Sequence, residues 1–221
     1  MQANKRAIIA PSILSADPGR YAEEIRNISD TGAEWIHIDV MDGSFVPPIT
    51  FGANIVQVAR ANSKLFLDTH LMIANPRKHF EAFKAAGSDR ITFHVEASSE
   101  VAADLQAIRE LGIVNGLSLK PGTALEKILP FLPLCDLVLV MTVEPGWGGQ
   151  KFMESCLAKI APLKRAIQDA RLPTLIEVDG GINKETAARC VSAGADVLVA
   201  GSYIFNEADR TAAVNNLRGS A

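Results

Sequence analysis

The chain has 221 residues, of which 48% are hydrophobic and 21% are charged, and its net charge is −3. This composition predicts one globular domain over residues 1–221. The near-neutral charge, without a Lys/Arg block, argues against a nucleic-acid partner or an anionic membrane surface. No apolar run approaches the ~20 residues that cross a bilayer. The three cysteines form no C-x-x-C pair, which is typical of free thiols in a cytoplasmic protein.

Short apolar runs rich in β-branched residues recur eight times, from RAIIAPS at the start to DVLVAGS near the end. Each has the length of a strand, and most are separated by segments with helix signals. Helix starts are expected at four polar residues, Asp17, Asn75, Thr123 and Asn183. Left-handed residues that end helices are expected at Gly32, Gly87, Gly112 and Gly194.

The strands are almost continuously apolar and no hairpin-length link joins them, so the sheet should be parallel. Eight strands alternating with helices favour an α/β fold of the closed (β/α)8 TIM-barrel type over an open doubly wound sheet. The open sheet's G-x-G-x-x-G fingerprint does not follow the first strand. In a barrel, functional residues gather where the strands end.

Polar residues stand at these strand ends with a spacing that turns them inward. The stretch WIHIDVMDG places His37 and Asp39 on one face of a strand, and Asp68 and His70 repeat the spacing in the next strand. Asp179 ends the seventh strand. Buried charges are costly unless they are paired or bind a metal. His37, Asp39, His70 and Asp179 therefore form a candidate site for one divalent ion (Zn²⁺, Fe²⁺, Mn²⁺ or Co²⁺), with a plain hydrogen-bond network as the alternative.

Three glycine-rich turns follow the last three strands and predict a phosphate site, because glycines let backbone N–H groups approach an anion. Turn geometry alone is the alternative reading of any one of them. The residues concerned are Gly146, Gly148 and Gly149, then Gly180 and Gly181, then Gly201 with Ser202. Three methionines at strand ends, Met41, Met72 and Met141, are either core residues or an apolar cap around the reacting carbons. His94 is interpreted as a satisfied barrel histidine rather than a residue behind the site.

These groups favour acid–base chemistry at a carbon, since no activated nucleophile is evident. A divalent ion polarises a ketone and stabilises the enediolate that forms on proton loss. In the barrel, Asp39 and Asp179 approach the centre from nearly opposite sides. Opposed carboxylates suit inversion at carbon, which predicts an epimerase, whereas an aldose–ketose isomerase can use one base on one face.

The motifs APSILSAD, HIDVMDGSFVP, DTHLM, ITFHVEAS, MTVEPGWGGQKFM, IEVDGGI and AGSYIF resemble the ribulose-phosphate 3-epimerase family, in order over residues 8–205. The resemblance implies interconversion of D-ribulose 5-phosphate and D-xylulose 5-phosphate in the pentose phosphate pathway and often the Calvin cycle. It implies that His37, Asp39, His70 and Asp179 bind the metal, with Asp39 as proton acceptor and Asp179 as proton donor. It also assigns substrate contacts to Ser12, His70, Gly146, Trp147, Gly148, Gly149, Asp179, Gly180, Gly181, Gly201 and Ser202.

Four positions depart from the family's commoner pattern, namely Val95, Glu144, Trp147 and Tyr203, and none removes a metal ligand or carboxylate. The rival readings are a 3-epimerase of a longer ketose such as D-allulose 6-phosphate, a phosphosugar decarboxylase and a non-catalytic phosphosugar-binding barrel. The decarboxylase would need a lysine–aspartate array that the second strand lacks. A homo-oligomer is expected, and residues 44–52 or 144–152 are candidates for a loop that closes over substrate.

Overall fold

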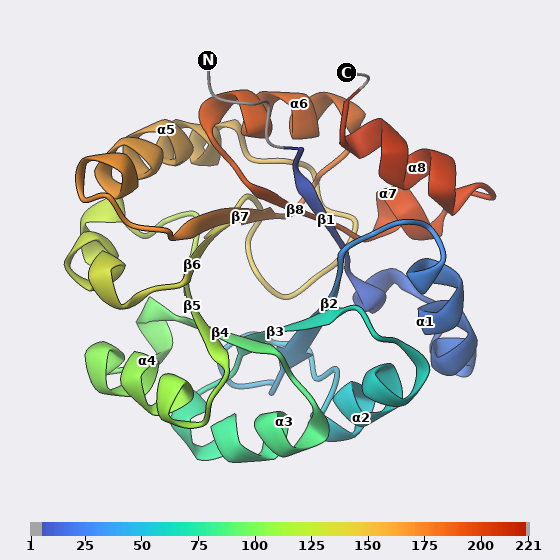
Figure 1. The fold of residues 1–221 in the computed structure, drawn as a ribbon, viewed down its shortest axis with the longest axis horizontal. Coiled ribbons are helices and arrows are strands. Elements are labelled where there is room, and N and C mark those ends of the chain that lie inside the picture. The colour runs from blue at the N-terminus through green and yellow to red at the C-terminus, as the bar shows by residue number, and fades with distance from the viewer. Residues whose placement is uncertain (1–5, 220–221) are drawn as a thin grey trace.

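The computed structural model describes residues 6–219, and all eight predicted strands are present within one or two residues of their expected bounds. They form one parallel sheet that curls into a barrel (Figure 1). The predicted TIM barrel is thereby confirmed. The strands are β1 (Ile8–Pro11), β2 (Trp35–Met41), β3 (Phe66–Met72), β4 (Arg90–His94), β5 (Val114–Leu119), β6 (Leu137–Met141), β7 (Leu175–Asp179) and β8 (Val197–Ala200).

The barrel is closed between its first two strands, where pairing is shortest. A parallel bridge joins Ser12 to His37, and the Glu34 N–H donates to the Ile9 carbonyl over 3.3 Å. Elsewhere the register is continuous, and it pairs Asp39 with His70 across β2 and β3. The two strands that carry most of the predicted metal ligands are therefore direct neighbours.

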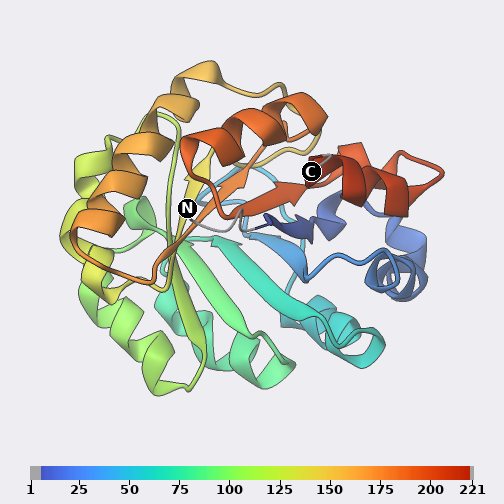
Figure 2. The same ribbon diagram turned by 45° about the horizontal axis from the view of Figure 1, so that its top comes forward.

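Helices surround the strands on the outside, as Figure 2 shows after rotation. They are α1 (Tyr21–Ser29), α2 (Ala53–Asn62), α3 (Phe80–Ala86), α4 (Val101–Glu110), α5 (Glu154–Asp169), α6 (Lys184–Ala193), α7 (Ser202–Phe205) and α8 (Arg210–Leu217). Short 3₁₀ turns add η1 (Ile13–Ser15), η2 (Pro18–Arg20), η3 (Pro76–His79), η4 (Val95–Ala97), η5 (Leu125–Lys127) and η6 (Leu129–Leu134).

Two of the four predicted helix starts are confirmed. Asp17 caps η2, and Asn183 caps α6 in a reciprocal capping box with Thr186. Asn75 instead lies in the left-handed region with φ 52° and makes no capping bond. Thr123 is not a cap either, because its hydroxyl donates to Glu96.

The segment between β5 and β6 contains only 3₁₀ turns where an α-helix was expected. Its stretch LPFLPL carries two prolines, and each removes a backbone N–H that an α-helix would use. The four glycines expected to be left-handed all have positive φ, from 75° to 116°, namely Gly32, Gly87, Gly112 and Gly194.

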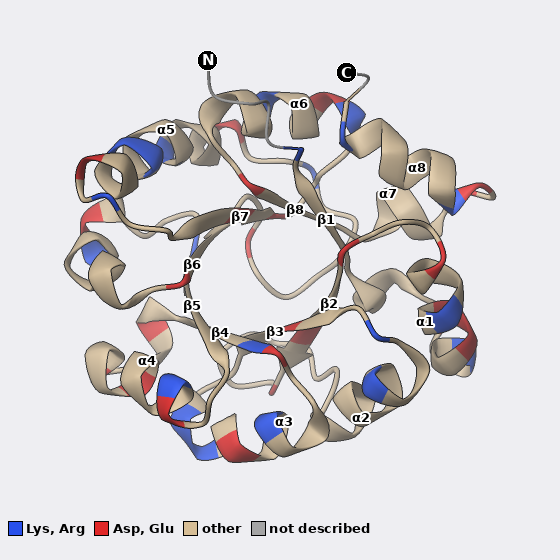
Figure 3. Ribbon diagram, in the orientation of Figure 1, with Lys and Arg blue, Asp and Glu red and all other residues tan. Residues whose placement is uncertain are grey.

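The interior divides into an apolar layer between sheet and helices and a second apolar cluster inside the barrel. Lys, Arg, Asp and Glu are spread over the outer helices with both signs mixed (Figure 3). Within residues 6–219, no helix has the length and apolarity to cross a membrane. The informative charges are therefore the buried ones at the strand ends.

Candidate active site

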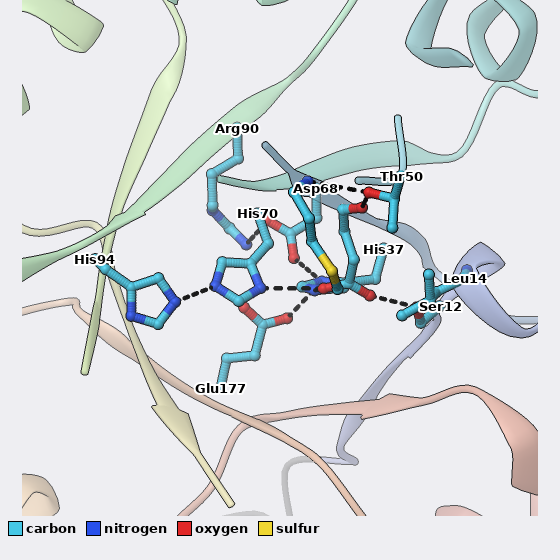
Figure 4. A network of polar contacts seen from close by, with 11 residues as sticks. Ser12, Leu14, His37, Thr50, Asp68, His70, Arg90, His94 and Glu177 are labelled. Carbon is cyan, nitrogen blue, oxygen red and sulfur yellow. Dashed lines mark hydrogen bonds and ion pairs between the residues drawn. The ribbon is translucent and has the colours of Figure 1, made fainter. Parts of the chain in front are cut away.

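Alternation along three adjacent strands brings a set of imidazoles, carboxylates and a guanidinium into the barrel (Figure 4). Residues 35, 37, 39 and 41 share the inner face of β2, residues 66, 68 and 70 that of β3, and residues 90, 92 and 94 that of β4. All three strands are buried almost throughout. The polar members must therefore satisfy one another.

Asp39 lies at the centre of this set. Its Oδ2 accepts a 2.6 Å hydrogen bond from the Ser12 hydroxyl, and its Oδ1 lies 3.2 Å from His37 Nε2 and 3.1 Å from His70 Nδ1. Burial alone would raise the pKa of Asp39, but the charge and hydrogen bonding of His37, followed by those of His70, hold it well below its usual value. Asp39 is therefore an ionised carboxylate whose negative charge suits a bound cation.

The four predicted metal ligands converge. His37, Asp39, His70 and Asp179 each offer one donor atom, and these atoms all lie within 4.8 Å of one another. His37 Nδ1 donates to Asp68 Oδ2 over 2.8 Å, so in a neutral ring Nε2 carries a lone pair that faces the Asp39 carboxylate. Two lone pairs at that distance repel unless a cation or a proton lies between them. The N2O2 donor set and this buried, unpaired Nε2 fit a divalent ion.

The two imidazoles differ in charge preference. Burial disfavours the charged form of His37, but the Asp39 and Asp68 carboxylates outweigh it and raise the pKa of His37 well above its usual value. In His70, burial prevails and lowers the pKa. The second proton of His37 therefore lies between Nε2 and Asp39 Oδ1, the position that also suits a metal cation.

Asp179 approaches from the other side of the barrel in a different environment. Its side chain makes no hydrogen bond within the described residues, and burial followed by the charge of Asp39 raises its pKa to about 7. The two carboxylates therefore differ in protonation near neutral pH, with Asp39 ionised and Asp179 partly protonated.

Beneath the four ligands lies a second buried charged group. Arg90 Nη1 pairs with Asp68 Oδ1 over 3.4 Å, and its guanidinium lies 4.3 Å from the Trp35 ring centroid and 4.9 Å from that of Phe66. Burial and the charge of Asp68 raise the pKa of Glu177 well above its usual value. A protonated Glu177 avoids the repulsion that a second carboxylate beside Asp68 would meet, and its Oε1 lies 3.8 Å from His37 Nδ1. Arg90, Asp68 and Glu177 are all buried below the predicted ligands.

Above the ligands is a cavity of about 590 Å³. Its walls include every predicted substrate-binding residue except one, namely Ser12, Gly146, Trp147, Gly148, Gly149, Asp179, Gly180, Gly181, Gly201 and Ser202. The exception is His70, which is fully buried beneath the cavity floor, so its direct contact with substrate stays a prediction. Met41, Met72 and Met141 also line the cavity and form apolar wall beside Asp39.

Two glycines in the turn after β7 stand where a side chain would collide with neighbouring atoms. Gly181 has φ 66°, and a Cβ there would collide with the backbone of Phe152. A Cβ on Gly180, at φ 120°, would lie 2.5 Å from a Val143 methyl carbon. Within residues 6–219, no hydrogen bond uses the N–H of Gly181 or of Ser202. Two backbone donors on the cavity wall are thus free for an anion.

The two candidate closing loops meet at the cavity mouth. The side-chain amide of Gln150 donates to the carbonyls of Glu144 and Trp147 over 2.7 and 2.8 Å, which shapes residues 144–152. A Cβ on Gly146 would lie 3.5 Å from Pro48 in the other loop. Trp147 is 64% exposed. Which loop closes stays a prediction.

Sequence reasoning missed several residues that organise the site. Thr50 donates from its hydroxyl to the Asp39 carbonyl over 2.7 Å and accepts from the Met41 N–H. Arg90 could have been found because it shares the inner face of its strand with His94. Glu96 follows His94 with the same two-residue spacing that singled out His37 and Asp39. His94 is a buried barrel histidine with a hydrogen-bond partner on each ring nitrogen, as interpreted, and one of these partners is the predicted ligand His70.

A TIM barrel with opposed carboxylates below a glycine-lined cavity is compatible with an enzyme that moves protons on a phosphorylated substrate, and comparisons with known proteins identify the class as an isomerase. A 213-residue alignment with ribulose-phosphate 3-epimerase of Bacillus subtilis (strain 168) has 47% identity, covering 96% of this chain and 98% of that protein. The Synechocystis sp. protein of the same name is 46% identical over 219 residues, with coverage of 98% and 95%. The profile of the "Ribulose-phosphate 3 epimerase family" matches residues 8–205. This chain belongs to the ribulose-phosphate 3-epimerase family and is an epimerase of pentose phosphate metabolism.

Solved structures outside that family share the fold. KGPDC from Streptococcus mutans superposes with a TM-score of 0.71 at 15% identity, covering 96% of each chain. At this identity the likeness concerns the barrel alone. The chemistry therefore has to be argued from the site.

Proposed function

We propose that the enzyme interconverts D-ribulose 5-phosphate and D-xylulose 5-phosphate by removing and returning the proton at C3. The observation that carries the proposal is the pair Asp39 and Asp179, which reach the same point from opposite walls with different pKa values. Groups whose environments push their pKa values apart are suited to act as base and acid.

In the forward direction, Asp39 accepts the C3 proton from one face of the substrate. The resulting enediolate is planar at C3, and Asp179 returns a proton to the opposite face, which inverts the carbon. In the reverse direction the two residues exchange roles. The Ser12 hydroxyl, which donates to Asp39 Oδ2, orients the base toward the cavity.

His37, Asp39, His70 and Asp179 would hold the divalent ion. When bound, such an ion supplies positive charge beside the oxygens that become negative as the proton leaves. Ser12, His70 and the glycine turns are the proposed substrate contacts, and the free N–H groups of Gly181 and Ser202 support a phosphate seat between the turns after β7 and β8. The methionines keep water away from C3.

The direct experiment incubates the protein with D-ribulose 5-phosphate in D₂O and follows C3 by NMR. We expect deuterium at C3 together with D-xylulose 5-phosphate, and loss of both when a strong chelator strips the metal. Turnover that survives complete metal removal would refute the metal role and keep the epimerase.

A parallel reaction with D-allulose 6-phosphate tests the rival substrate, since a longer phosphoketose would meet the same residues. A higher kcat/KM for the six-carbon sugar would overturn the proposed substrate. Action in the cytoplasm, which the three buried free cysteines support, and a homo-oligomeric state stay predictions. Light scattering of the purified protein measures the latter.

A further inference from the structure

A chain of hydrogen-bonding side chains extends from His70 away from the cavity, and the reaction proposed above does not use it. His70 Nε2 lies 2.9 Å from His94 Nε2 (Figure 4). On the far side of the ring, His94 Nδ1 lies 3.2 Å from Glu96 Oε2. His94 is fully buried, with the Phe45 ring packed on it at a centroid distance of 4.8 Å. The Glu96 side chain is 24% exposed, so this series of hydrogen-bonded side chains ends at the protein surface.

Glu96 is fixed at its outer end. Its Oε1 accepts a 2.9 Å hydrogen bond from the Lys120 N–H and another from the Thr123 hydroxyl. Burial favours the protonated acid, but the hydrogen bonds from His94, Thr123 and Lys120 outweigh it and hold the pKa of Glu96 at about 2. Glu96 is therefore an ionised group that only accepts hydrogen bonds.

The ionised Glu96 determines which ring nitrogens of His94 and His70 carry protons. Because Glu96 only accepts, His94 must donate to it from Nδ1. A buried imidazole prefers its neutral form, so His94 Nε2 carries a lone pair. His70 must then donate from Nε2, which leaves the lone pair of His70 Nδ1 facing Asp39 Oδ1 at 3.1 Å.

We propose that His94 and Glu96 are positioning residues, which hold His70 in the Nε2-protonated tautomer so that Nδ1 faces the metal. The inference rests on the proposed role of His70 as a metal ligand. It gives the two ligand histidines opposite tautomers, because Asp68 holds the proton of His37 on Nδ1. Once a metal replaces the second proton of His37, the lone pairs of both rings would face Asp39 Oδ1, which neither ring would achieve with the other tautomer.

The tautomers can be measured without metal or substrate. Protein labelled with ¹⁵N in histidine and stripped of metal is examined by long-range ¹H–¹⁵N correlation, with His70→Gln and His94→Gln used to assign the rings. We expect the proton of His70 on Nε2 and that of His94 on Nδ1. A proton on Nδ1 of His70 overturns the proposal whether or not a variant folds.

Variants then test whether Glu96 sets this arrangement. Glu96→Ala removes the terminal acceptor, and we expect mixed tautomers at His70 and metal affinity lowered by ~10–100-fold, as is usual for residues behind a metal ligand. Glu96→Gln keeps an acceptor oxygen and should recover most of that loss. Glu100→Ala is the matched surface control, because the Glu100 side chain makes no hydrogen bond or ion pair within residues 6–219.

Thr123→Val separates positioning from general loop support. It removes one contact to Glu96 but leaves the oxygen that accepts from His94, so the tautomers should stay as in the parent protein. Equal loss in Thr123→Val and Glu96→Ala, or unchanged tautomer and affinity in Glu96→Ala, would refute the positioning role. A parent protein that binds no metal but has the expected tautomers would refute the ligand assignment alone.

Discussion

The barrel interior has a polar half and an apolar half. The polar half, formed by β2, β3 and β4, contains His37, Asp39, Asp68, His70, Arg90 and His94. The apolar half, formed by β1, β6 and β8, contains Ala10, Leu137, Leu139, Met141, Val197 and Val199. β7 runs between two of the apolar strands and places Glu177 and Asp179 among them. Two aspartates at the same level therefore belong to different halves.

The different surroundings of Asp39 and Asp179 give the two carboxyl groups different pKa values. Asp39 in the polar half has a hydroxyl and two imidazoles within 3.2 Å, and its pKa is held low. Asp179 in the apolar half has no hydrogen-bonding partner within the described residues, and burial raises its pKa to about 7. The surroundings, rather than the residue type, thus give the two aspartates different pKa values, as the proposed roles of base and acid require.

The largest expected effect comes from making either carboxylate unable to exchange protons. Asp39→Asn and Asp179→Asn should each lower kcat by about 10²–10⁴-fold, the range that general acid–base groups supply. Phosphorylated substrate analogues should still bind Asp179→Asn, since the glycine turns are intact, and calorimetric titration measures this. Loss of analogue binding in Asp179→Asn would indicate a structural role.

Next in size is the loss of one ligand from the polar half. His70→Ala should weaken metal binding by at least ~10-fold, because removing a ligand exceeds the effect of altering the residues behind it. Metal content after dialysis against a graded chelator series measures this. A content equal to that of the parent protein would contradict the ligand assignment.

The comparison predicts opposite stability changes for the same substitution in metal-free protein at pH 8. The lowered pKa of Asp39 contributes stability that is present above the unfolded value near 4, so Asp39→Asn should lose on the order of 1–3 kcal/mol. The raised pKa of Asp179 costs stability as pH rises from about 4 through about 7, so Asp179→Asn should gain on the order of 1–4 kcal/mol at pH 8. Urea unfolding at pH 5 and pH 8 measures both, and changes of equal sign would break the comparison.

The smallest expected effect on activity and stability comes from a change in the backbone of the proposed phosphate site. Gly181→Ala should raise KM for the phosphorylated substrate and cost about 1–2 kcal/mol of stability, because the left-handed conformation and the Phe152 backbone both oppose a Cβ. Gly112→Ala is the matched control. Gly112 has φ 75° with no atom within 4 Å of a Cβ, so it should change stability alone.

Sequence patterns predicted the barrel and the convergence of His37, Asp39, His70 and Asp179 because both depend on local periodicity. Alternation in WIHIDVMDG fixes which side chains face inward, and parallel strands bring their ends to one edge. Asn75 and Thr123 were mispredicted because their residue types suit caps, whereas the backbone of Asn75 and the contact of Thr123 with Glu96 are set by tertiary structure.

The residues that sequence reasoning missed act across strands. Arg90 reaches Asp68 on β3 and lies over Trp35 on β2, a contact that depends on register rather than on any spacing within one segment. The link from His70 through His94 to Glu96 likewise crosses from β3 to the end of β4. The different pKa values of Asp39 and Asp179 depend on strand order, which sequence supports only once the barrel is assumed.

The guanidinium of Arg90 lies over the rings of Trp35 and Phe66 and pairs with Asp68, so packed side chains fill the barrel below Asp39. The cavity over Asp39 lies on the side of the turns that follow β6, β7 and β8, so we expect substrate to enter and product to leave by that side. Product has to depart before the next sugar arrives, so it acts as a competitive inhibitor of its own formation. His37 and His70 are both fully buried, so an ion that they held would be reached only from the cavity, and we expect a bound sugar to slow its exchange.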